Sequence, residues 1–186
     1  DATGEGMVNV DDLNLVLSNW QAACPSATLS TAWVPKRSVF DAEVPAQFLG
    51  VSLAFIGDID NDGFGDILAG CVGTLFNSDS VPKVISGRDG TMRNASQFTA
   101  DAFGLSVTGV GDVNNDGVPD YAIGAPNDDF NGDSAGSAWL ISGATGFFIH
   151  IWDGANDYYR LGHAVSSIGD VNGDGINDIA VGEPRD

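Results

Sequence analysis

Hydrophobic and polar residues alternate in short runs along most of the chain, and a glycine closes nearly every run. Three of these runs, FLGVSLAFIG, FGLSVTGVG and LGHAVSSIG, each lead into an acidic stretch. Alternation over roughly four to eight residues predicts a β-strand, and the Gly, Asp and Asn residues between the runs predict tight turns. The pattern therefore predicts a mainly β fold.

The acidic stretches recur in one order. GDIDNDGFGD (57–66), GDVNNDGVPD (111–120) and GDVNGDGIND (169–178) are each followed by a short apolar run, namely DILAGC, DYAIGAP and DIAVGEP. The first two units continue with VPKVISGRDG and SAWLISGATG, and FFIHIWDG adds a fourth strand-like run to the second unit. Four short strands separated by Gly and Asp turns, repeated at a spacing above 50 residues, are typical of β-propeller blades.

The second unit, FGLSVTGVGDVNNDGVPDYAIGAP (103–126), resembles the FG-GAP repeat of the integrin α-subunit propeller and of many bacterial surface proteins. The resemblance covers about residues 47–186 and implies repeats at 47–102, 103–160 and a truncated 161–186. An integrin-type propeller implies about seven blades. We therefore expect a partial propeller of four-stranded antiparallel blades, cut from a longer protein. The name-giving positions are Phe103-Gly104 with Gly124-Ala125-Pro126, Leu161-Gly162 with Gly182-Glu183-Pro184, and Leu49-Gly50 with Gly70-Cys71-Val72.

The chain carries 26 acidic and 7 basic residues, a formal net charge of −19. Such a charge argues against a nucleic-acid partner, because the phosphates would be repelled. The acids are clustered in the repeated stretches, which favours uptake of cations. No apolar run approaches the length of a membrane span.

The spacing D-x-[DN]-x-D-G-x-x-D suits Ca²⁺, which takes about six to eight oxygen ligands, whereas Mg²⁺ prefers to keep its waters. Asx-rich turns without a metal are the alternative interpretation. The resemblance implies Ca²⁺ at the same positions. The candidate ligands, with a backbone carbonyl at the seventh position, are Asp58, Asp60, Asp62, Phe64 and Asp66; Asp112, Asn114, Asp116, Val118 and Asp120; and Asp170, Asn172, Asp174, Ile176 and Asp178.

The first 24 residues begin DATGEGMVNVDDLNLVLSNW and have the spacing of an EF-hand-like loop followed by an amphipathic helix. They resemble one half of a type I dockerin, which implies attachment to a cohesin-type module. A solvated acidic turn before a packing helix is the alternative. Residues 25–46 are predicted to be a linker with an edge strand near TAWVP. The candidate ligands of this loop are Asp1, Thr3, Glu5, Met7 (carbonyl), Asn9 and Asp12.

Other chemistry is disfavoured by its context. Ser134 in GDSAG fits the spacing of a nucleophile elbow, but an acidic loop precedes it and a strand-like run follows where a helix is needed. The histidines, His150 and His163, are interpreted as strand residues, and Trp33, Trp139 and Trp152 either fill space between blades or form a sugar-stacking surface. Cys24 and Cys71 could form a disulfide or stay as buried thiols.

The sequence thus predicts a calcium-binding, non-catalytic protein that is secreted or held at a bacterial cell surface. Its partner is expected to be an extracellular protein or glycan, bound by loops on a rigid propeller. Two alternatives remain: an accessory region of a secreted polysaccharide-degrading enzyme whose catalytic domain lies elsewhere, and a structural spacer.

Overall fold

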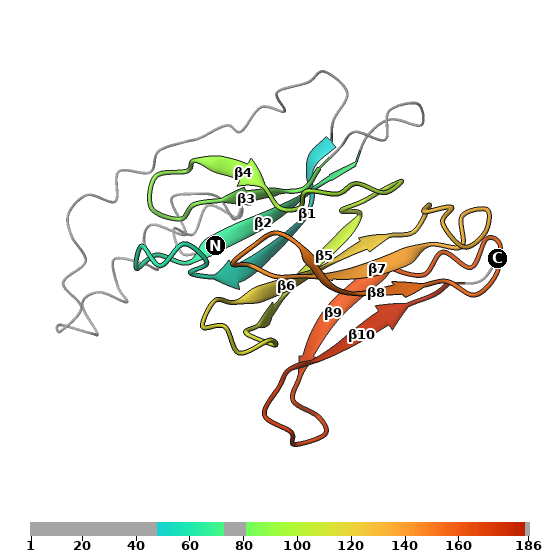
Figure 1. The fold of residues 1–186 in the computed structure, drawn as a ribbon. Coiled ribbons are helices and arrows are strands. Elements are labelled where there is room, and N and C mark those ends of the chain that lie inside the picture. The colour runs from blue at the N-terminus through green and yellow to red at the C-terminus, as the bar shows by residue number, and fades with distance from the viewer. Residues whose placement is uncertain (1–47, 73–80, 185–186) are drawn as a thin grey trace, which may run out of the picture. The chain divides into compact units, whose positions relative to one another are not determined.

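The structure is a computed structural model of the 186-residue chain, and it describes residues 48–72 and 81–184. These residues form ten strands and no helix (Figure 1). Within them, accordingly, no helix has the length and hydrophobicity that a membrane span requires. The loop and helix predicted for residues 1–24, and the linker predicted for residues 25–46, lie outside the described residues.

The strands form three antiparallel sheets in chain order, two of four strands and one of two. This arrangement confirms the mainly β prediction and is consistent with propeller blades. The first sheet contains β1 (Phe48–Gly57), β2 (Asp66–Val72), β3 (Lys83–Ile85) and β4 (Met92–Asn94); the second contains β5 (Ser106–Gly111), β6 (Asp120–Ala125), β7 (Ser137–Ile141) and β8 (Phe148–Asp153); the third contains β9 (Ala164–Gly169) and β10 (Asp178–Gly182).

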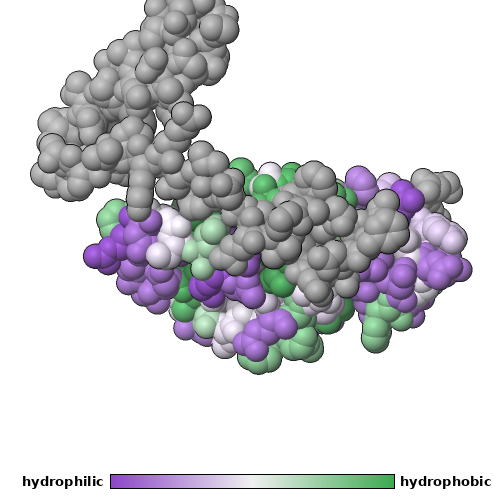
Figure 2. Space-filling view, turned by 90° about the horizontal axis from the view of Figure 1, so that it is seen from above, coloured by the Kyte–Doolittle hydropathy of each residue, from purple (hydrophilic) through white to green (hydrophobic). Residues whose placement is uncertain are grey.

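Each sheet packs against the next through apolar side chains. Ile56, Leu68 and Val84 of the first sheet share a buried cluster with Val107, Tyr121 and Ile123 of the second. On the other face of the second sheet, Val110, Ala122 and Leu140 pack with Ile179 of the third. Strand β6 is therefore covered on both sides, and all six of its residues are buried. Seen from above in Figure 2, hydrophilic residues are densest toward the left and right ends of the described part.

Glycines at the repeated motifs allow this close approach. A Cβ added to Gly70 would lie 2.1 Å from the Gly104 carbonyl oxygen, and one added to Gly124 would lie 1.9 Å from that of Gly162. The two parts of the repeat motif therefore meet across neighbouring sheets, where no side chain fits. The same two carbonyls accept hydrogen bonds from Ser52 Oγ and Ser106 Oγ, both at 2.8 Å.

Packing explains the positions of Trp139, Trp152, His150 and Cys71. The Trp139 ring contacts Phe103 at 5.4 Å between centroids, so Trp139 fills space between the first two sheets. Trp152 packs on the second buried cluster, with the His150 ring 4.6 Å away. The Cys71 thiol is buried on β2, and burial raises its pKa. His163 is exposed in a bend just before β9, so the prediction that it is a strand residue was wrong, whereas His150 does lie in β8. Trp33 and Cys24 lie outside the described residues.

Candidate metal centre

Three acidic loops join the first and second strands of the sheets: loop 1 (58–66) between β1 and β2, loop 2 (112–120) between β5 and β6, and loop 3 (170–178) between β9 and β10. All three have left-handed backbone at the same places, which explains the recurrence of Gly and Asn there. The φ angles are 79°, 76° and 74° at Gly57, Gly111 and Gly169; 58°, 59° and 80° at Asn61, Asn115 and Gly173; and 89°, 88° and 89° at Gly63, Gly117 and Gly175.

The first aspartate of each loop is held by backbone N–H groups that lie further along the same loop. The N–H of the sixth residue donates to Asp58, Asp112 and Asp170 at 2.8 Å in every case. The N–H of the fifth residue donates to the same three carboxylates at 3.1, 3.0 and 3.1 Å. In loop 3 these backbone N–H groups, that of Gly175 first, lower the pKa of Asp170.

The third and fifth side chains repeat this pattern. The third residue accepts the N–H of the fifth, and the fifth accepts the N–H of the seventh, in all three loops. The side-chain oxygens are those of Asp60, Asn114 and Asn172, at 3.2, 2.9 and 2.9 Å, and of Asp62, Asp116 and Asp174, at 2.8, 2.9 and 2.8 Å.

The ninth residue is the most buried of the acids. Asp66 and Asp120 are 1% and 0% exposed. Asp120 accepts the Val113 N–H at 2.9 Å and the Gly143 N–H at 3.0 Å. Burial raises the pKa of Asp120, and the hydrogen bonds from Gly143 and Val113 oppose that rise. Asp66 is bonded in the same way, by the N–H groups of Ile59 and Gly87, both at 3.0 Å.

Sequence reasoning missed Gly87 and Gly143, which follow β3 and β7. A Cβ on Gly87 would lie 2.0 Å from the Gly65 carbonyl oxygen, and a Cβ on Gly143 would lie 1.9 Å from that of Pro119. Only glycine lets the backbone come close enough to donate to the buried aspartate. The signal was present in the chain, because Ile-Ser-Gly stands at the same place in VPKVISGRDG and SAWLISGATG.

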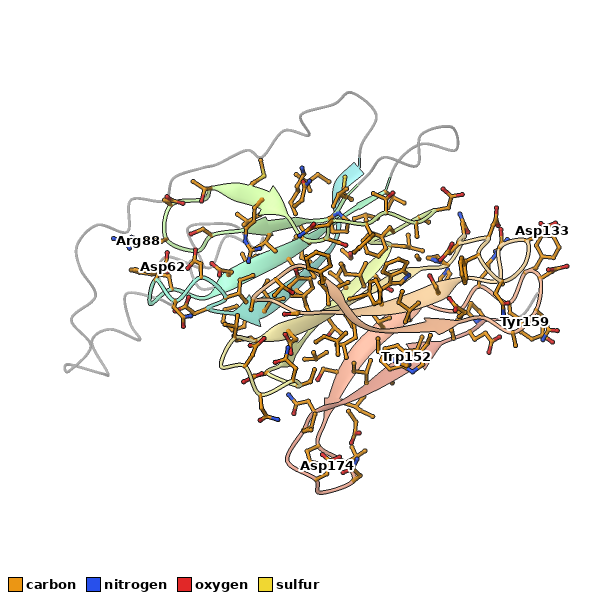
Figure 3. The ribbon with its side chains drawn as sticks, viewed as in Figure 1. Asp62, Arg88, Asp133, Trp152, Tyr159 and Asp174 are labelled. Carbon is orange, nitrogen blue, oxygen red and sulfur yellow. The ribbon has the colours of Figure 1, made fainter. Side chains whose placement is uncertain are left out.

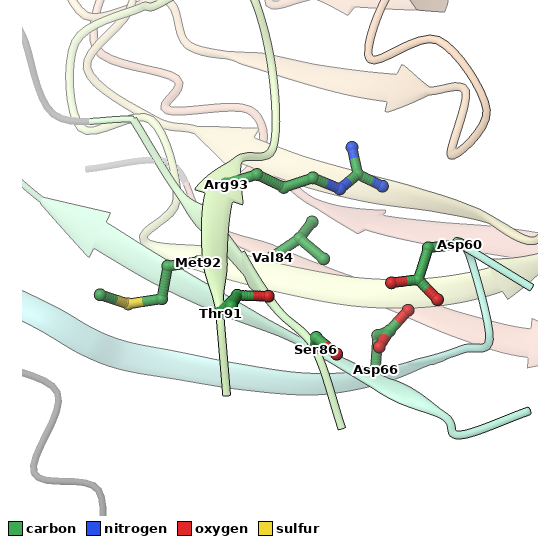
Figure 4. Close-up of a pocket in the computed structure, with 7 residues that line it drawn as sticks. All are labelled: Asp60, Asp66, Val84, Ser86, Thr91, Met92 and Arg93. Atoms are coloured by element: carbon green, nitrogen blue, oxygen red, sulfur yellow. The ribbon is translucent and has the colours of Figure 1, made fainter. Parts of the chain in front are cut away.

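The carboxylates of loop 1 converge. Asp58, Asp60 and Asp66 each offer one oxygen, and these oxygens all lie within 4.8 Å of one another. Figure 4 shows Asp60 and Asp66 side by side, in a recess also lined by Ser86, Thr91 and Arg93. Partial desolvation and the neighbouring carboxylates, that of Asp66 foremost, raise the pKa of Asp60.

The converging oxygens fit a divalent cation. Two oxygens bound to one Ca²⁺ at about 2.3–2.6 Å lie at most about 5 Å apart, and the spacing in loop 1 falls below that limit. A carboxylate has about four lone-pair sites, so one or two backbone hydrogen bonds leave sites available for a metal. The predicted carbonyl positions, Phe64, Val118 and Ile176, occupy the seventh place of the loops.

Loop 3 differs from loop 1 at the third position, where it has an amide. Asn172 Nδ2 donates to Asp174 Oδ2 at 3.1 Å and to Asp178 Oδ1 at 3.2 Å. The amide therefore links two of the predicted ligand carboxylates. Loop 2 also has an amide there, Asn114.

Two further predicted sites are the nucleophile elbow at Ser134 and the amino-terminal loop. Ser134 lies in a turn before β7, with a φ of 45° and its N–H bonded to Asp129 at 2.6 Å. This is not the strand-to-helix turn of a nucleophile elbow. The ligands predicted near the amino terminus, Asp1 to Asp12, lie outside the described residues. Figure 3 labels Asp62 and Asp174 in loops 1 and 3, whereas Asp133 lies away from them, toward the right of the view.

The family model for the FG-GAP repeat matches residues 103–141 and 161–186. Mouse integrin alpha-8 is 32% identical over 161 residues, which cover 80% of this chain and 15% of that protein. Drosophila melanogaster integrin alpha-PS2 is 32% identical over 172 residues, covering 82% of this chain and 12% of that protein. The chain thus spans less than a sixth of the length of these relatives. Two segments of the chain thus match the FG-GAP repeat, and the chain is similar to integrin alpha subunits over most of its length.

Proposed function

We propose that this chain is a calcium-binding, non-catalytic part of a secreted or cell-surface adhesion protein. The observation that carries the proposal is the convergence of Asp58, Asp60 and Asp66 in a loop whose backbone is built three times. A single acidic turn would be ordinary, whereas one hydrogen-bond pattern in three places supports a shared function of the three loops. Carboxylate and carbonyl oxygens are the ligands that Ca²⁺ prefers.

Charge supplies the physical reason for a cation. Loop 1 holds four carboxylates, and loops 2 and 3 hold three each. Like charges at these distances repel and should loosen the hairpins that the loops close. Bound Ca²⁺ would contribute two positive charges in each loop. The side chains of positions one, three, five and nine and the carbonyl of position seven would hold it, so its binding free energy would appear as stability of the fold.

Adhesion is the role we propose for the stabilised sheets. The relatives are integrin alpha subunits, and loops on rigid scaffolds often carry binding residues. The partner would be an extracellular protein or glycan. For residues 1–24 we propose attachment to a cohesin-type module, which rests on the sequence pattern alone. A screen of immobilised glycans and extracellular proteins, with and without chelator, tests the adhesive role.

Calorimetric titration with CaCl₂ after removal of metal by chelator tests the calcium sites. We expect three sites from the loops described here, and a fourth if the amino-terminal loop binds. Asp116→Ala should remove one site, because it deletes the ligand at the fifth position of loop 2. The matched control is Asp101→Ala, which removes the same charge from an exposed position outside the loops.

Two results would overturn the calcium proposal. One is a titration that releases or absorbs no heat, together with a melting temperature that is the same with and without chelator. The other is an equal loss of binding in Asp116→Ala and Asp101→Ala, which would mean that the overall negative charge attracts the ions and the loops do not form sites.

A further inference from the structure

Loops 2 and 3 are in contact with the sheets that precede them. Asn177, the eighth residue of loop 3, donates from Nδ2 to the carbonyl oxygen of Val110 at 2.9 Å. Val110 belongs to β5 of the second sheet and is 1% exposed. Two residues later comes Asp112, the first aspartate of loop 2. A single side chain of loop 3 therefore reaches the strand end from which loop 2 begins.

The accepting carbonyl lies at an irregular place in its own sheet. Gly109 pairs with Tyr121 and Gly111 with Asp120, so that Val110 is the extra residue of a β-bulge. An extra residue in a bulge is left out of the regular ladder, and bulges are common beside functional sites. The Asn177 amide thus bonds the one residue of β5 that the ladder passes over.

The contact between loops 1 and 2 is of another kind. Pro119 is the eighth residue of loop 2, and it lies against Gly57, where an added Cβ would come within 2.9 Å of Pro119 Cγ. The bulge repeats here, because Phe55 and Gly57 pair with Ile67 and Asp66 and leave Ile56 between them. Proline offers no side-chain donor. A directional link from the eighth residue of an acidic loop to the preceding sheet is therefore made by Asn177 and not by Pro119.

We propose that Asn177 is a positioning residue that couples calcium binding in loop 3 to calcium binding in loop 2. The inference rests on the calcium-binding function proposed above. Asn177 stands between Ile176 and Asp178, the seventh and ninth positions, which would both serve as ligands. A loaded loop 3 fixes the segment that carries the amide, and the amide then holds Val110 and the backbone that leads to Asp112.

The left-handed Gly111, with a φ of 76°, connects Val110 to Asp112. Holding Val110 reduces the freedom of this junction and so lowers the entropic cost of assembling loop 2. Coupling between two sites is reciprocal, so a loaded loop 2 must favour loop 3 by the same factor. A single hydrogen bond contributes a net factor of about three to ten in an equilibrium constant.

Loop-specific readouts are available for the test. The N–H groups of Gly117 and Gly175 each donate to the first aspartate of their own loop at 2.8 Å. Their amide resonances in ¹⁵N-resolved NMR spectra should report calcium binding in loops 2 and 3 separately. Loop 3 is disabled with Asp174→Ala, and the dissociation constant of loop 2 is read at Gly117.

In the chain with Asn177, we expect Asp174→Ala to weaken calcium binding at loop 2 about threefold to tenfold. In a chain that also carries Asn177→Ala, Asp174→Ala should change the calcium dissociation constant of loop 2 less than twofold. Asn127→Ala, at an exposed asparagine outside the loops, is the matched control and should leave the coupling intact.

The outcomes separate this inference from the proposed function. If Asp174→Ala leaves the dissociation constant of loop 2, read at Gly117, unchanged in the chain with Asn177, the coupling is overturned but the calcium sites are not. An equal weakening with and without Asn177 shows coupling by another route and also overturns the role of Asn177. If neither glycine amide responds to calcium, the calcium-binding function fails and this inference fails with it.

Discussion

Loop 1 and loop 3 share one backbone but balance their negative charge in different ways. In both loops the third side chain accepts the N–H of the fifth residue, through Asp60 at 3.2 Å and through Asn172 at 2.9 Å. The second polar atom of that side chain is an oxygen in loop 1 and an N–H donor in loop 3. The amide donates to Asp174 and Asp178, whereas Asp60 faces other carboxylates.

The ninth position differs as well. Asp66 is 1% exposed and is bonded by Gly87 from beyond β3, whereas Asp178 is half-buried and its hydrogen bonds come from within loop 3. The loop backbone is held by the left-handed glycines and by carboxylate and amide oxygens that accept its N–H groups. At positions three and five only one side-chain oxygen is used in this way, so the two loops differ in what the second polar atom at position three does.

The largest expected effect is at the ninth position. In chelator, Asp66→Ala should lower the free energy of unfolding by about 2–4 kcal/mol, because the N–H groups of Ile59 and Gly87 lose their acceptor in a buried place. Asp178→Ala should cost about 1 kcal/mol or less, because water can replace the carboxylate. Urea unfolding followed by circular dichroism measures both.

Asp101→Ala serves as the control for removal of one negative charge at an exposed site. Equal losses in Asp66→Ala and Asp178→Ala would show that burial does not distinguish the two loops. In the same series in saturating calcium both losses should be larger than in chelator, because both variants then also lack one metal ligand.

The sequence was sufficient to predict nine of the ten strands, because each lies in an alternating or apolar run bounded by Gly, Asp or Asn. Strand β4 was missed. Its three residues, Met92, Arg93 and Asn94, are half-buried or exposed and carry no alternation. The strand exists because it pairs with β3, where Lys83 Nζ also donates to Asn94 Oδ1 at 2.7 Å. Such a strand depends on its neighbour, and short local patterns do not reveal it.

In the candidate loops, too, local features were predictable and long-range contacts were not. The spacing of the acceptors could be recognised in the sequence, since all the acceptors of one loop lie within nine residues. The donors that hold Asp66 and Asp120 from outside, Gly87 and Gly143, come from 21 and 23 residues away. Asn177 reaches Val110 across 67 residues and between sheets. These contacts depend on how the sheets stack, which the spacing within one repeat does not specify.

The next largest effect is expected at the residue after the ninth aspartate, where the sheets differ. Tyr121 stands there in the second sheet, where the first and third have Ile67 and Ile179. Its hydroxyl is buried and donates to the Ala95 carbonyl, and burial raises the pKa of Tyr121 to about 12. The stability that this shift contributes is complete below pH 10, where both states are protonated, and is lost as the pH rises through 12.

Unfolding free energy should therefore fall by about 2–3 kcal/mol between pH 10 and 12 on account of this residue. Tyr121→Phe should be less stable at neutral pH by about 1 kcal/mol, because Ala95 loses its donor, but should lack this part of the alkaline loss. Urea unfolding of both proteins across the pH range gives the difference. Parallel curves for the two proteins would place the alkaline loss elsewhere in the fold.

The smallest effect comes from exchanging the third residues of loops 1 and 3. In chelator, Asp60→Asn should raise the melting temperature, because it removes one carboxylate from the group formed with Asp58 and Asp66 and supplies an N–H donor like that of Asn172. Asn172→Asp should lower it, because Asp174 and Asp178 lose that donor and gain a repelling charge. In saturating calcium both shifts should shrink or reverse, since a carboxylate is the stronger ligand of a hard cation. Scanning calorimetry with and without calcium measures the melting temperatures of both variants. Asn114→Asp in loop 2 should lower the melting temperature in chelator less than Asn172→Asp does, because it adds a repelling carboxylate but removes no donor of this kind. Shifts of the same sign and size in chelator and in calcium would mean that the exchanged side chains act on the turn alone, and that the difference between the loops has no bearing on metal.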